Sequence, residues 1–176
     1  MDATLDLRPC QLAIVLGVDH KIQYFIDGVA PSDPCNTLRL RYLDFARDLT
    51  RRYPVDVICE EAKLGEESIA ETVADREALR YRNIEVPMQR RAELGIPLAY
   101  DVLSLEVSPE QKAKWNALHE SYMIDELLEA IAGARAAVVI CGVIHIPALA
   151  EALRTKFTRV EEYDVTAMPW FDRSLL

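Results

Sequence analysis

Apolar runs along the chain predict the strands of a buried sheet. Residues 12–16 and 137–141 are five consecutive apolar positions each, which is typical of strands covered on both faces. Residues 56–59, Asp-Val-Ile-Cys, are predicted to form a second buried strand directly before two glutamates. Residues 96–100 and 160–165 complete the set of five predicted strands.

Apolar residues at helical spacing lie between these strands. Leu38, Tyr42, Phe45 and Leu49 form one face of an amphipathic helix that stops before Pro54. Prolines in first turns, glycines after last turns and a capping box at 108–111 mark the ends of further helices. The predicted helices cover residues 38–52, 66–82, 87–94, 109–132 and 147–153.

The alternation of strands and helices predicts an α/β fold. We expect a three-layer sandwich with a mainly parallel central sheet and helices on both faces. A length of 176 residues with 51% hydrophobic positions fits one domain over 1–176 with a sizeable core. Residues 21–26 are predicted to continue the first strand or to form a turn of helix, and 168–171 to pack back as an apolar flap.

Charge and cysteine usage narrow the classes of partner and compartment. A formal net charge of −9 gives no electrostatic basis for binding nucleic acid. The apolar run 12–18 is too short to span a bilayer, and acidic residues precede it where a signal peptide carries positive charge. The four cysteines form no CxxC pair, which favours a reducing compartment. We therefore expect a cytoplasmic protein without nucleic-acid or membrane partners.

One four-residue pattern occurs twice, each time directly after five apolar residues. The first predicted strand is followed by Gly17-Val-Asp-His20, and the fourth by Gly142-Val-Ile-His145. A glycine at this point allows a tight turn as the chain leaves the sheet, and places the histidine over the sheet edge. Because parallel strands share one carboxyl edge, we expect His20 and His145 to lie close together.

Two carboxylates follow the second predicted strand. Glu60 and Glu61 come directly after residues 56–59, and neighbours along a strand point to opposite faces, so one of the two is expected at the histidine site. Two imidazoles and a carboxylate form a ligand set for a divalent transition metal. The same groups can act without a metal as a general acid and base. The catalytic or metal-binding candidates are His20, Glu60, Glu61 and His145.

These motifs are similar to those of a known superfamily. The two Gly-x-x-His motifs, the strand-end glutamates and the helix after the second motif resemble the TraB/GumN and TIKI proteins of the erythromycin-esterase and ChaN-like superfamily. His119-Glu-Ser-Tyr-Met123 resembles their Arg-acid-x-x-Met stretch, with histidine in place of arginine. The resemblance implies this α/β fold and activities such as metalloprotease, hydrolase with a histidine base, or haem binding.

Three functional hypotheses follow. The first is a hydrolase of an amide or ester bond in a small-molecule or peptide substrate, with or without a divalent metal. The second is a ligand-binding or regulatory module without turnover. The third is a structural partner in a complex, with Trp170 and Phe171 as an exposed apolar anchor.

Several other side chains have both a functional and a structural interpretation. Cys59 and Cys141 end predicted strands, where a buried core position is more common than a nucleophile. Asp19 can orient His20 or lie in solvent, and His119 can approach the sheet edge or stay on the helix surface. A group of arginines can hold an anionic substrate group or form ordinary ion pairs. The arginines are Arg76, Arg80, Arg82, Arg90 and Arg91.

Overall fold

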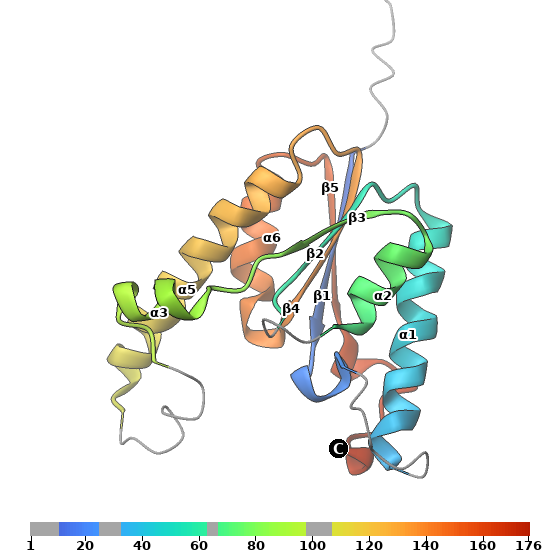
Figure 1. The fold of residues 1–176 in the computed structure, drawn as a ribbon, viewed down its shortest axis with the longest axis horizontal. Coiled ribbons are helices and arrows are strands. Elements are labelled where there is room, and N and C mark those ends of the chain that lie inside the picture. Colours follow the sequence, from blue (N-terminus) through green and yellow to red (C-terminus); the bar gives the residue numbers. More distant parts are fainter. Residues whose placement is uncertain (1–10, 25–32, 63–66, 98–106) are drawn as a thin grey trace, which may run out of the picture.

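The computed structural model of the chain describes residues 11–24, 33–62, 67–97 and 107–176. Its centre is a five-stranded sheet in which every paired strand is parallel, in the order β3-β2-β4-β1-β5 (Figure 1). The predicted α/β sandwich is confirmed. The strands are β1 (Leu12–Val18), β2 (Val57–Glu60), β3 (Arg80–Asn83), β4 (Ala136–Gly142) and β5 (Arg159–Asp164).

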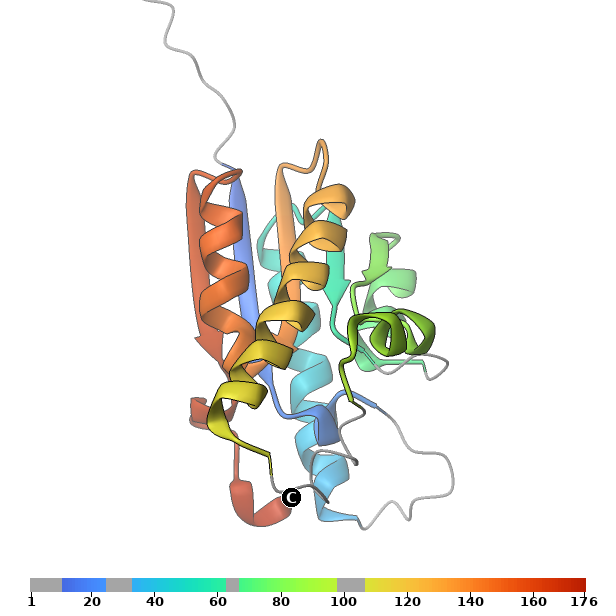
Figure 2. The ribbon, with the colours of Figure 1, turned by 90° about the vertical axis from the view of Figure 1, so that its left-hand side faces the viewer.

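Helices cover both faces of the sheet. The helices α1 (Pro34–Arg52) and α2 (Ile69–Arg76) pack on one face, whereas α5 (Pro109–Ala130) and α6 (Ile146–Arg154) pack on the other (Figures 1 and 2). The short α3 (Met88–Leu94) follows β3 and buries none of its residues. Among the described residues there are also four single turns of 3₁₀ helix: η1 (His20–Ile22), η2 (Val143–His145), η3 (Val165–Ala167) and η4 (Arg173–Leu175).

The apolar runs divide into two cores because successive strand residues point to opposite faces. In β1, Ile14 and Leu16 join the core under α1 and α2, while Ala13 and Val15 join the core under α5 and α6. All seven residues of β1 and of β4 are buried. These two central strands are therefore covered on both sides, as a continuous apolar run predicts.

Adjacent strands β1 and β4 are followed by helices on opposite faces of the sheet. From β1 the chain continues into α1, and from β4 into α6. Between such strands the loops diverge and leave a crevice at the carboxyl ends, which is where ligands bind in open α/β sheets. The two Gly-x-x-His motifs occupy this topological switch point, since one follows each strand.

Local signals located most helix ends correctly. Ser108 caps α5 by accepting a hydrogen bond from the Gln111 backbone N–H at 3.2 Å, as its capping box predicts. Gly95 ends α3 with a left-handed φ of 67°. The segment 21–26, as far as it is described, contains the end of η1 rather than a longer strand.

Two predicted elements were wrong in their described parts. The helix expected over 66–82 ends at Arg76, and Ala78 takes a positive φ of 54°. Residues 80–83 instead form β3, whose backbone completes the hydrogen bonding of β2 at the sheet edge. The strand expected over 96–100 is not formed at Ile96 and Pro97, and its remaining residues lie outside the described part.

The C-terminal segment packs back on the fold as predicted. The Trp170 ring lies 5.9 Å from that of Phe45, measured between centroids, and Arg41 Nη1 donates a 2.5 Å hydrogen bond to the Trp170 carbonyl. Trp170 and Phe171 are half-buried against the core under α1. In the described part of the chain, no helix combines the length and the apolar character needed to cross a membrane.

Candidate functional site

A buried carboxylate, that of Glu61, is the centre of the candidate site. Glu61 follows β2, and its backbone N–H extends the strand pairing by donating to the Ile140 carbonyl at 2.8 Å. Its side chain is 5% exposed, and Oε2 accepts a 2.8 Å hydrogen bond from the Gly142 backbone N–H. The carboxylate is thus held at the carboxyl end of the neighbouring strand β4.

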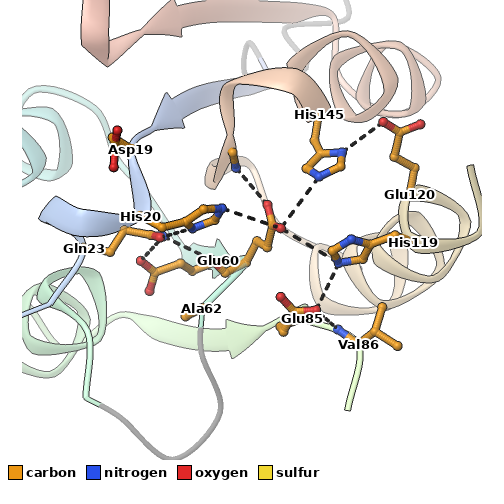
Figure 3. Close-up of polar contacts among 12 residues, drawn as sticks. Asp19, His20, Gln23, Glu60, Ala62, Glu85, Val86, His119, Glu120 and His145 are labelled. Atoms are coloured by element: carbon orange, nitrogen blue, oxygen red, sulfur yellow. Dashed lines mark hydrogen bonds and ion pairs between the residues drawn. The ribbon is translucent and has the colours of Figure 1, made fainter. Parts of the chain in front are cut away.

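Three imidazole rings surround this carboxylate. The distances from Glu61 Oε1 to the histidine Nε2 atoms are 3.7 Å for His145, 3.9 Å for His20 and 3.9 Å for His119. His145 and His119 are buried, whereas the His20 side chain is 54% exposed. Figure 3 shows the three rings converging from three different elements, η1, η2 and α5.

Each ring has its own hydrogen-bond acceptor. His20 Nδ1 lies 2.5 Å from Gln23 Oε1, and His145 Nδ1 lies 2.9 Å from a carboxylate oxygen of Glu120. His119 Nε2 lies 3.0 Å from Glu85 Oε1 (Figure 3). An acceptor at one ring nitrogen fixes the tautomer and the orientation of an imidazole.

Gln23 determines the tautomer of His20. The Gln23 amide nitrogen donates to Glu60 Oε1 and to the Glu61 carbonyl, both at 3.0 Å, so its oxygen must accept from His20 Nδ1–H. His20 Nε2 then presents a lone pair. The Glu120 carboxylate likewise accepts from His145 Nδ1–H, and His145 Nε2 faces Glu61. Nε2 lone pairs and a carboxylate oxygen that converge in this way repel one another unless a proton or a metal ion lies between them.

The geometry fits a divalent metal. Glu61, His119 and His145 each offer one ligand atom, and these atoms lie within 4.8 Å of one another. Tetrahedral zinc with bonds of 2.0–2.1 Å needs donors about 3.4 Å apart. The Glu61–histidine distances of 3.7 and 3.9 Å would shorten by a few tenths of an ångström, and the two histidine nitrogens would approach by up to about 1.4 Å. His119 would exchange Glu85 for the ion at Nε2. Glu85 would keep hydrogen bonds from Arg91, at 2.8 Å, and from the Val86 N–H.

His119 joins the site because it lies on the buried face of α5. Apolar spacing in the sequence predicts a core face that is buried at Leu127 and Ile131 but only half-buried at Trp115, Leu118 and Tyr122. The buried residues of α5 are His119, Met123 and Leu127, which are spaced by four positions. That spacing is visible in the sequence, so a histidine in line with Met123 and Leu127 was the available signal.

Glu60 lies outside this cluster, on the other face of the sheet. Its carboxylate accepts hydrogen bonds from Gln23, from Ser68 Oγ and, at 2.9 Å, from Tyr81 OH. Burial raises the pKa of Glu60 to about 7, against the opposing effect of these hydrogen bonds. Of the two predicted glutamates, the structure therefore brings only Glu61 to the histidines, which matches the expectation of one.

The two motif glycines allow close approach and do not form tight turns. Gly142 has φ −60° and ψ 144°, and Gly17 is not among the residues with positive φ. A Cβ atom at Gly17 would lie 2.4 Å from Ile146 Cδ1, and one at Gly142 would lie 3.1 Å from His20 Nε2. The prediction of a tight turn at each glycine was wrong, because Gly17 and Gly142 are still paired within β1 and β4.

The remaining candidate side chains have structural roles. Burial raises the pKa of the Cys59 thiol to about 12 and that of Cys141 well above its ordinary value, which disfavours a thiolate nucleophile at either position. Asp19 caps η1 by accepting from the Lys21 backbone N–H at 2.9 Å. Three of the arginines form ion pairs: Arg82 with Glu126, Arg90 with Glu93, and Arg91 with Glu85.

A pocket opens beside the cluster, over the carboxyl ends of β1, β4 and β5. Its volume is about 600 Å³, and His20 and Gly142 form part of its wall. His20 therefore lies near the Glu61 carboxylate and also lines the pocket. This arrangement places a space of substrate size next to a set of potential ligands and bases.

The fold and the site together define a doubly wound α/β domain with a glutamate–histidine cluster at its switch point. Comparisons of the chain with protein-family models, with curated protein sequences and with solved structures give no match in any of the three. The resemblance to the TraB/GumN and TIKI proteins therefore stays an expectation from the sequence motifs.

Proposed function

We propose that this chain hydrolyses an amide or ester bond at a divalent transition-metal ion held by Glu61, His119 and His145. The single observation that carries the proposal is the convergence of three imidazole nitrogens on one buried carboxylate oxygen. The Glu120 carboxylate at Nδ1 of His145, on the far side of the ring from Glu61, matches the hydrogen bonding that orients metal-ligating histidines. A bound divalent ion lowers the pKa of water and polarises a carbonyl group.

His20 is proposed as the general base. Its Nδ1–H is held by Gln23, so Nε2 is free to accept a proton from the attacking water and to return it to the leaving group. It is the most exposed of the three histidines, and it lines the pocket where a substrate would lie. Glu120 is a positioning residue, because it contacts Nδ1 of His145, whose Nε2 is proposed to bind the ion. Glu85 contacts the His119 Nε2 that would turn to the ion.

Titration of the purified, chelator-treated protein with Zn²⁺, Mn²⁺ and Co²⁺ tests the metal site. We expect one ion per chain, with binding lost in Glu61→Gln and His145→Ala and retained in His20→Ala. Glu151→Gln is the matched control for loss of a carboxylate, since the Glu151 side chain is 78% exposed. Absence of binding by the wild type to all three ions would refute the metal site.

A screen with ester and amide substrates tests the hydrolytic step. We expect His20→Ala and His145→Ala both to abolish turnover, although only His145→Ala loses the ion. Activity that survives chelation would favour metal-free acid–base chemistry at the same residues. An ion-binding protein that turns over no ester or amide would instead support the ligand-binding module and contradict the proposed hydrolase.

A further inference from the structure

The pocket beside His20 has an apolar wall. Val143 and Ile144 form one part of it, and Phe171 and Leu176 form another. Ile144 is 67% exposed although it directly precedes the buried His145. Exposed large hydrophobic side chains at a pocket wall are typical of a site that binds an apolar group.

The polar side chains of the pocket are not equivalent. The carboxylate of Asp19 accepts the Lys21 N–H, and that of Asp164 accepts both the N–H and the hydroxyl of Thr166, at 2.8 and 2.7 Å. Both acids are thus already used to cap single turns. The cations have no such use: among the described residues, neither Lys21 nor Arg173 pairs with a carboxylate, and Arg173 donates only to the Thr166 hydroxyl at 3.1 Å.

We infer that the pocket takes an anionic ligand with an apolar portion, whose charge is held by the lining cations Lys21 and Arg173 and whose apolar portion packs on Ile144 and Phe171. As the substrate class of the proposed hydrolase, this is an ester or amide whose acyl or leaving group has an apolar chain and a negative charge. This assignment of the pocket to the substrate rests on the proposed function. Lys21 and Arg173 have no carboxylate partner among the described residues, although the net charge of the protein is −9. Their positive charges therefore favour a ligand with a negatively charged group.

Three probes with the same six-carbon chain and different charge test this inference on the 176-residue, chelator-treated protein. They are 1-hexanesulfonate, 1-hexanol and hexyltrimethylammonium, and binding is followed by calorimetry or by NMR line broadening of the probe. A sulfonate is a weak ligand for transition metals, so residual ions do not dominate the result. We expect hexanesulfonate to bind about tenfold more tightly than hexanol, because two charge-assisted contacts are added.

Variants locate the binding. Lys21→Gln/Arg173→Gln should remove the preference for sulfonate, whereas Lys112→Gln/Lys156→Gln changes the net charge equally at two exposed positions and should keep it. Ile144→Ser should weaken all probes. Equal binding of the three probes, tighter binding of the ammonium, or no binding of any probe would overturn the inference. Metal titration is independent of these measurements, so loss of the proposed ion site would not be mistaken for failure of the anion site.

Discussion

The two motif glycines allow a sharp test, because they occupy equivalent positions in the sequence but have different neighbours. At Gly17 an added methyl group would lie 2.4 Å from Ile146 Cδ1 and 3.0 Å from the Val143 Cα atom. Ile146 is buried and Val143 offers backbone, so little can move away. At Gly142 the tightest contact is 3.1 Å to His20 Nε2, at the end of a half-exposed side chain.

These distances set the expected magnitudes. Overpacking of this kind costs about 1–3 kcal/mol, and alanine recovers about 0.4–1 kcal/mol through the unfolded chain, so Gly17→Ala should lower the free energy of unfolding by about 1–2 kcal/mol. Gly142→Ala has an allowed backbone conformation and should stay within about 0.5 kcal/mol of the wild type. It should nevertheless displace His20 and lower kcat/KM about tenfold, with metal affinity retained.

Urea unfolding followed by far-UV circular dichroism measures both variants. With m values of about 2 kcal/mol/M, the Gly17→Ala midpoint should fall by about 0.5–1 M while that of Gly142→Ala stays near the wild type. An unchanged midpoint in Gly17→Ala, or equal losses in the two variants, would refute the assignment of one glycine to helix–sheet packing and the other to the site.

Three further predictions follow from single contacts. Glu120→Gln should weaken metal binding about tenfold in calorimetry, because it removes the charge that orients His145, without a shift in the unfolding midpoint of the metal-free protein. Asp56→Asn should destabilise the fold by about 1–2 kcal/mol at pH 7, since the Asp56 carboxylate accepts the Arg135 and Ala136 N–H groups. Burial acts to raise the pKa of Asp56, but the hydrogen bonds outweigh it and lower the pKa. The stabilisation is therefore complete above the unfolded pKa and is lost as the pH falls through the lower folded pKa. The difference in urea midpoint between the two proteins should begin to shrink below about pH 4 and disappear below the folded pKa. Cys59 and Cys141 should resist iodoacetamide at pH 8 until urea is added, as judged by peptide mass mapping, and rapid labelling in the native state would contradict their burial.

The fold class and the edge that bears the site could be predicted from the sequence because their signals are local. Continuous apolar runs marked β1 and β4, and the capping box at Ser108 marked the start of α5. Parallel strands then required His20 and His145 to meet at one edge, whatever the details of packing. The strand β3 escaped prediction because its residues Arg80–Asn83 carry polar side chains at the sheet edge, where backbone pairing with β2 decides the conformation.

The composition of the site was decided by tertiary structure. Alternation at the end of β2 required one of the two glutamates to face the histidines. The packing of α5, η1 and η2 around one face selected Glu61, and Glu60 was left among Gln23, Ser68 and Tyr81. His119 is brought to the site because it lies on the buried face of α5. The positions of the strands and the burial of their apolar residues are encoded by neighbouring residues, whereas the choice among polar side chains depends on which distant element covers each face.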